Sequence, residues 1–282
     1  MYNYTIKYSC VNTYENPVFE SFWQYIVTPQ NNSTQELSSG VFSVSNDAVI
    51  EKSINGYNFE TARIHTKKPF ESLTFEAVFK LTKTKDNPLK IDPKYKIEDG
   101  YKALKELDFQ VDYEAFLNTT ELTTLPKEQV SLFDFDTSKS ILDNLKRLNN
   151  WVHKYIVFKA GETTTETLLE TVIEKKKGLS PDFTHLLCAI ARVNKIPARY
   201  VSGYLHQGDG LLGDSQMCAW VEVLVPNLGW IGLDPVNNLL TDHNYIKVAH
   251  GRDYKDCEPL KQLLFSYGEK TSKCVVEVTY EQ

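Results

Sequence analysis

The spacing of apolar residues changes from a strand period to a helix period near residue 137. In the opening segment YNYTIKY, apolar and polar residues alternate, as in a strand with one buried face. From residue 141 to residue 155, apolar residues recur every three or four positions, which is typical of an amphipathic helix. Because further strand-like segments follow the helices, the pattern predicts an α+β fold.

The pattern divides the chain into three parts. Residues 1–85 are predicted to form an all-β N-terminal domain, either a sandwich or a barrel, because turn-forming stretches such as QNNSTQELSSG separate strand-sized segments. Residues 86–130 are predicted to be a linker with one short helix. Residues 131–282 are predicted to form a core in which helices over 141–155, 166–177 and 181–194 precede an antiparallel run of strands.

Composition argues against several classes of partner. The 282 residues carry a net charge of -6, and lysines and arginines form no long stripe, so nucleic acid is not an expected partner. A membrane span is not expected either, because no run of 18 apolar residues occurs. The first ten residues lack the layout of a signal peptide, so we expect a cytoplasmic protein.

The five cysteines do not follow a recognisable pattern. They stand at positions 10, 188, 218, 257 and 274, an odd number without pairs at the spacing of metal ligands. We therefore expect neither a disulfide framework nor a cysteine-rich zinc site, and no metal or cofactor is predicted. A reducing compartment is the simplest setting for such a chain.

Three motifs within residues 178–260 resemble one known family. The segments GLSPDFTHLLCAIARVNKIPARYVSGYL, CAWVEVLVPNLGWIGLDPVNN and YIKVAHGRDYKDCEPL are similar, in this order, to the bacterial transglutaminase-like superfamily. The resemblance implies a papain-like core of helices packed on an antiparallel sheet or barrel, and the N-terminal third is similar to the β domain that precedes this core in bacterial members. Members include transglutaminases, peptidases and amidases, which are cysteine enzymes.

The catalytic positions that the resemblance implies are altered in this chain. The family's nucleophilic cysteine lies in G-V-C-x-D-F, its basic histidine in H-A-W and its orienting aspartate in G-x-D-P. These positions correspond here to Ser180, Cys218 and Asp234, so only the aspartate is retained.

The family mechanism is not available to these three residues. A serine hydroxyl needs a general base within hydrogen-bond reach, whereas a cysteine is ionised by a helix N-terminus and an imidazolium. Cys218 is a poor base, and Asp234 has no imidazole to orient. As a nucleophile, Cys218 would sit in mid-strand and would face Asp234, whose charge raises the pKa of a thiol. Among the histidines, His185 is expected to face away from Ser180, and His206 and His243 lie in predicted loops.

Each of these positions also has a simple structural interpretation. Ser180 before Pro181 is a good helix N-cap, and this role is favoured over that of a nucleophile. Cys218 in an alternating strand is typical of a small buried residue. Asp234 before Pro235 can hold a turn by accepting backbone hydrogen bonds.

Two hypotheses about function therefore remain. In the first, the chain is a non-catalytic pseudoenzyme that binds a peptide-like or acyl partner in the former active-site cleft. In the second, it is an active hydrolase or acyltransferase of the peptidase or amidase type, with Ser180 or Cys218 as an unusual nucleophile. A histidine or lysine side chain beside Ser180 would favour the second hypothesis. The oligomeric state is left open.

Overall fold

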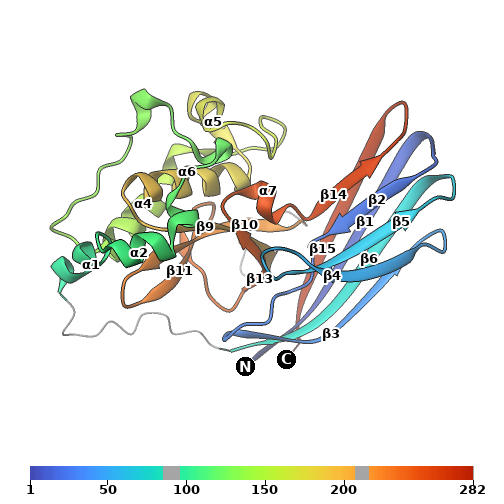
Figure 1. Ribbon diagram of the computed structural model, residues 1–282, viewed down its shortest axis with the longest axis horizontal. Helices are drawn as coiled ribbons and strands as arrows, with labels where there is room; N and C mark the ends of the chain where they lie inside the picture. The colour runs from blue at the N-terminus through green and yellow to red at the C-terminus, as the bar shows by residue number, and fades with distance from the viewer. Residues whose placement is uncertain (85–95, 207–215, 282) are drawn as a thin grey trace.

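The computed structural model describes residues 1–84, 96–206 and 216–281. The chain forms a β-sandwich and a helix-rich core that lie side by side (Figure 1). The predicted class, α+β with an all-β N-terminal part, is confirmed. Residues 86–95 of the predicted linker lie outside the described residues, and the rest of it holds several short helices rather than a single one.

The β-sandwich consists of two antiparallel four-stranded sheets. The first has the order β15-β1-β6-β3 and the second the order β14-β2-β5-β4. The strands are β1 (Tyr2–Val18), β2 (Ser21–Tyr25), β3 (Gln35–Val44), β4 (Val49–Ile54), β5 (Glu60–Thr66), β6 (Phe70–Lys83), β14 (Leu260–Leu264) and β15 (Lys270–Glu281). Alternate residues of β1 and β6 point inward, and the Tyr25 and Phe75 rings stack with centroids 3.8 Å apart. The alternation seen in the sequence thus builds an aromatic core between the sheets.

The last two strands pair differently from the predicted division, which assigned them to the core. β14 pairs with β2, and β15 pairs with β1 along most of its length, so both complete the sandwich. Alternation over residues 274–280 predicts a strand but does not say which sheet receives it.

The same pairing corrects the expectation about cysteines. Cys10 on β1 lies directly opposite Cys274 on β15, and the two form a disulfide. Their separation of 264 residues in the sequence hid the pair, because only the sheet register brings them together.

The core packs helices on the five-stranded antiparallel sheet β12-β11-β10-β9-β13. Its strands are β9 (Ala198–Leu205), β10 (Cys218–Val225), β11 (Gly229–Asp234), β12 (Leu239–Leu240) and β13 (Tyr245–Gly251), and β7 (Val157–Phe158) pairs separately with β8 (Lys177–Gly178). Its helices are α1 (Ile97–Ala103), α2 (Leu107–Asp112), α3 (Glu114–Leu117), α4 (Ile141–Tyr155), α5 (Leu169–Lys175), α6 (Ser180–Val193) and α7 (Tyr254–Cys257), with 3-10 turns η1 (Glu121–Thr123) and η2 (Lys127–Gln129).

Helix α6 is the central element of the core. Every residue from Asp182 to Arg192 is buried, which is typical of a helix that is covered on all sides. Phe183, Leu186 and Ile190 belong to the same apolar cluster as residues of β10 and β11. This packing fixes the helix N-terminus, with Ser180, against the sheet.

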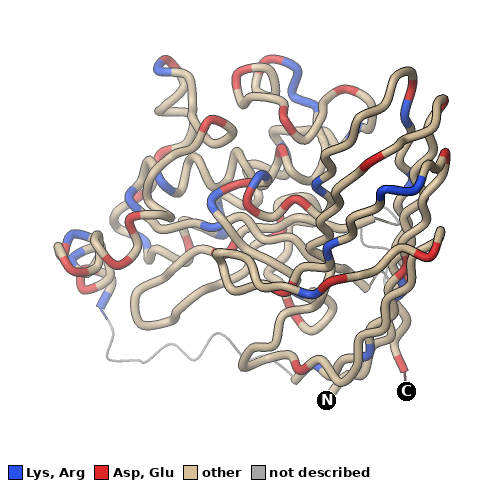
Figure 2. Tube along the Cα trace, turned by 45° about the vertical axis from the view of Figure 1, so that its right-hand side comes forward, with Lys and Arg blue, Asp and Glu red and all other residues tan. Residues whose placement is uncertain are grey.

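Charged side chains are spread over the molecule. In Figure 2, acidic and basic residues are interspersed along the trace of both the core and the sandwich. Within the described residues, no helix is long and apolar enough to cross a membrane.

Candidate functional site

Ser180, Cys218 and Asp234 line a single cavity of about 240 Å³. The core contributes these three residues, and the sandwich contributes others, so the cavity lies where the two parts meet. Further lining residues are mostly apolar or aromatic, among them Tyr8, Leu205, Met217, Val236, Tyr254 and Leu260. The positions that the sequence resemblance singled out are therefore neighbours in space.

The Ser180 hydroxyl joins helix α6 to strand β10. It donates a hydrogen bond to the backbone carbonyl of Ala219 (2.9 Å) and accepts one from the backbone N–H of the same residue (3.1 Å). The hydroxyl proton is thus directed at a peptide oxygen. A carbonyl oxygen is a weak base, and the two hydrogen bonds stabilise the junction between α6 and β10.

The prediction that Ser180 caps α6 is wrong. The N-cap is Leu179, and the carboxylate of Asp182 accepts the backbone N–H of Leu179 (2.7 Å) and the hydroxyl of Thr163 (2.6 Å). Burial raises the pKa of Asp182 to about 6, although both hydrogen bonds oppose the shift. A side chain at Gly178 would collide with this carboxylate, which explains the glycine before the helix. Asp182 does the capping, and the Ser180 hydroxyl is left for β10.

Asp234 ends strand β11 and is buried. Its Oδ1 accepts the backbone N–H groups of Val236 (2.8 Å) and Asn237 (3.0 Å), as expected for a turn-forming aspartate. Its Oδ2 accepts the side-chain amide of Asn237 (2.7 Å) and the hydroxyl of Tyr245 (2.7 Å). Four donors therefore surround the carboxylate.

Tyr245 is the residue of this site that the sequence analysis missed. Burial, followed by the negative charge of Asp234, raises the pKa of its phenol, so the phenol remains protonated and donates. Its ring packs edge-on against Trp220, with centroids 5.5 Å apart. The donor beside Asp234 is thus a tyrosine from β13. No local motif identifies it, because β13 reaches this point only through the order of the sheet.

Helix α4 holds the turn after Asp234 from the other side. The Asn149 amide donates to the backbone carbonyl of Asp234 (3.2 Å), and His153 Nδ1 lies 2.9 Å from the carbonyl of Val236. Ser140 caps this helix by accepting the N–H of Asp143. The aspartate turn is therefore fixed by two elements that are distant in sequence.

Cys218 opens strand β10 and is half-buried. It is the first residue of β10 and pairs with Gly203 of β9, whereas the sequence analysis placed it in mid-strand. Its sulfur lies 3.9 Å from the carbonyl of Gln216. The side chain lines the cavity beside the Ser180–Ala219 contact.

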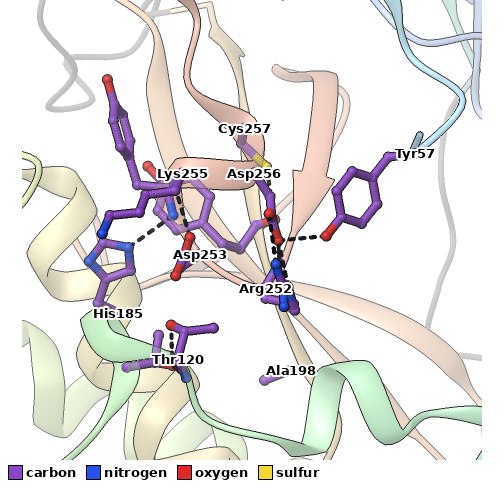
Figure 3. A network of polar contacts seen from close by, with 12 residues as sticks. Tyr57, Thr120, His185, Ala198, Arg252, Asp253, Lys255, Asp256 and Cys257 are labelled. Atoms are coloured by element: carbon purple, nitrogen blue, oxygen red, sulfur yellow. Dashed lines mark hydrogen bonds and ion pairs between the residues drawn. The ribbon is translucent and has the colours of Figure 1, made fainter. Parts of the chain in front are cut away.

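His185 lies on α6 but serves another part of the core. Its Nε2 accepts the backbone N–H of Tyr254 (3.1 Å) at the start of α7, as Figure 3 shows. Burial lowers the pKa of His185 to about 3, and the charge of Arg192 adds to the shift, so the ring is neutral. In the same view, Arg252 and Tyr57 contact Asp256, which links α7 to the sandwich.

The other described histidines do not line the cavity either. His206 contacts Asn244, and His243 stacks on Tyr2. All six histidines fall within the described ranges, and none of them lines the cavity; the same holds for the lysines and arginines of those ranges. In the described part of the chain, no three histidine, cysteine or acidic side chains gather as metal ligands would.

Comparisons with known proteins agree with this architecture. An uncharacterized protein of Mycobacterium tuberculosis (strain H37Rv) is 25% identical over 306 residues, covering 99% of this chain and 92% of that protein. One of Mycobacterium leprae is 33% identical over 133 residues, covering 46% of this chain and 47% of that protein. A crystal structure from Cytophaga hutchinsonii, described as that of a candidate cysteine protease, superposes with a TM-score of 0.77 at 16% identity over 100% of this chain and 91% of the other.

The family assignment rests on the core. Residues 133–235, which span α4, α6 and the strands up to Asp234, match the sequence profile of the transglutaminase-like superfamily. The structural likeness at 16% identity shows the same fold. Residues 133–235 of this chain therefore match the transglutaminase-like superfamily, and the fold around them agrees with that match.

Proposed function

We propose that this protein is a non-catalytic member of its superfamily, and that its cavity binds an uncharged, peptide-like or acyl ligand. One observation carries the proposal: the Ser180 hydroxyl exchanges both of its hydrogen bonds with the backbone of Ala219. A nucleophile needs its proton directed at a base, and here it is directed at a carbonyl.

The surroundings of Ser180 support the same proposal. No described histidine or lysine lines the cavity, so among the described residues neither side chain is placed to serve as a general base for Ser180. Asp234 already has four donors, including Tyr245, and so has no need of an imidazole.

The lining of the cavity indicates the class of ligand. Apart from Asp234, whose carboxylate is occupied, the described lining residues are uncharged, so a charged ligand would lose hydration without gaining a counter-ion. The volume of about 240 Å³ lies just below the usual range of roughly 300–1,000 Å³ for ligand pockets. A single apolar side chain with its flanking amides fits these properties.

Methionine NMR offers a direct binding test. The chain has two methionines, Met217 in the cavity lining and Met1 at the exposed N-terminus, so ¹³C-methyl labelling gives one reporter and one internal control. Neutral N-acetyl-leucinamide is expected to shift the Met217 signal alone. N-acetyl-leucine and leucinamide, which add one negative and one positive charge, are expected to shift it much less at equal concentration.

A narrowed cavity provides the control for binding. Leu260→Trp adds bulk at a half-buried lining position, and it is expected to abolish the shift of Met217. A shift that persists in this variant, or equal shifts with all three probes, would argue against a ligand site in the cavity.

Activity is tested separately. The p-nitrophenyl ester of N-acetyl-leucine is expected to be hydrolysed no faster by the natural protein than by Ser180→Ala or Cys218→Ala. Turnover that either substitution abolishes would instead establish a hydrolase with an unusual nucleophile. The double variant Ser180→Cys, Cys218→His restores the thiol and imidazole of the family, and thiolate absorbance against pH should show a thiol pKa below that of Ser180→Cys alone.

A further inference from the structure

Strand β15 forms one edge of the first sheet of the sandwich. It pairs with β1 on one side, and within the described part of the chain no strand pairs with its other side. Side chains that face the sandwich interior, such as Val276 and Val278, remain half exposed, and Val275 on the outer face is 41% exposed. A long edge strand with open backbone groups is a template for another strand.

The charges on the outer face of β15 favour one register for pairing with β15 of a second copy of the chain. Around a two-fold axis through Val275, antiparallel pairing places Lys273 of each copy opposite Glu277 of the other, and Thr271 opposite Thr279. If the register of the two strands shifts by two residues in either direction, both charge pairs are lost. If it shifts by four, Lys273 or Glu277 of one copy lies opposite the same residue of the other copy, and like charges in direct opposition are unfavourable.

We propose that two copies of this chain form a symmetric dimer through β15, with residues 270–280 of each copy paired about Val275. The two four-stranded sheets then become one continuous sheet, in an isologous interface. Backbone hydrogen bonds along the strands supply the attraction, and the charge pattern sets the register. Closing the edge also covers Val276 and Val278 on the inner face.

The existing ion pairs of β1 and β15 extend across this interface. Glu277 already lies 3.5 Å from Lys7 of the neighbouring strand β1, with both side chains exposed. Lys273 lies opposite Val11 of β1 and has no ion pair among the described residues. In the dimer, Glu277 is flanked by Lys7 and by the second copy's Lys273, so each Lys273 gains an opposite charge.

Light scattering after size-exclusion chromatography measures the outcome. The natural protein is expected to elute with twice its mass of 32.4 kDa. Lys273→Glu and Glu277→Lys each create two like-charge contacts in the dimer, and each variant alone is expected to shift to the monomer at the same concentration. Lys80→Glu, an exposed change on the interior strand β6, is the matched control and is expected to remain dimeric.

The decisive experiment mixes the two single variants. A heterodimer of Lys273→Glu with Glu277→Lys places glutamates opposite lysines at both positions, so a 1:1 mixture of the two monomeric variants is expected to regain the dimer mass. A natural protein that is monomeric at high micromolar concentration would overturn the proposal. A dimer that is unaffected by either substitution would overturn it as well, because it would use another surface.

Discussion

Two polar groups of the cavity lining are held in different ways. The Ser180 hydroxyl contacts the backbone of a single residue, Ala219, at a helix–strand junction. The Asp234 carboxylate accepts four hydrogen bonds from a turn and from Tyr245. Both groups therefore have structural partners. Because Asp234 has more hydrogen-bond partners than Ser180, we expect the loss of stability on removing each group to differ greatly.

The largest effect is expected from Asp234→Ala. It removes a buried carboxylate that accepts from the Tyr245 hydroxyl, two backbone N–H groups and the Asn237 side-chain amide, so we expect a loss of about 3–5 kcal/mol in the free energy of unfolding. Urea unfolding followed by circular dichroism measures it. A loss below about 1 kcal/mol would mean that water replaces the carboxylate and that the Asp234 and Ser180 positions do not differ.

Tyr245→Phe separates the carboxylate from its aromatic donor. It removes one charge-assisted hydrogen bond and keeps the ring against Trp220, so we expect a loss of about 2 kcal/mol. The same unfolding experiment applies, and Tyr267→Phe at an exposed position is the control. Equal losses in the two variants would show that the hydroxyl of Tyr245 contributes nothing.

His185→Gln tests a polar residue of α6 that faces away from the cavity. The pKa of His185 is about 3 when folded and near 6.5 when unfolded, so the unfolded state takes up the proton first as the pH falls. Because of this residue, the free energy of unfolding of the natural protein should fall by about 2 kcal/mol as the pH is lowered from 7 to 5. It should continue to fall toward pH 3. The variant should show a correspondingly smaller loss between pH 7 and pH 5, and identical pH profiles would contradict it.

The smallest effect is expected from Ser180→Ala. It removes two hydrogen bonds to Ala219 at the rim of a cavity where water can replace them, so we expect a loss of about 1 kcal/mol. Ser43→Ala, an exposed serine on β3, should stay within about 0.5 kcal/mol of the natural protein. A loss as large as that of Asp234→Ala would remove the distinction between the two positions.

The sequence predicted the core better than it predicted the sandwich. Strands β9 and β10 occupy the residues that alternation and the family-like motifs marked, because both signals are local. The pairing of β15 with β1 is not local, and neither that pairing nor the Cys10–Cys274 disulfide could be predicted from the sequence. In the site, the motifs singled out Ser180, Cys218 and Asp234, which line one cavity, and their roles stay predictions. The partners Ala219 and Tyr245 depend on how helix and sheet meet, which no short motif encodes.

The return of the last strands to the sandwich has a consequence for synthesis on the ribosome. β1 emerges first, but its neighbour β15 is made only after the entire core, so one side of β1 must wait unpaired during translation. Contacts that join distant parts of a chain form slowly, and waiting strand edges are prone to aggregate. The core, whose helices and strands are closer in sequence, is free to fold first, and the closing of β14 and β15 onto the sandwich is the step at which a chaperone would be most useful.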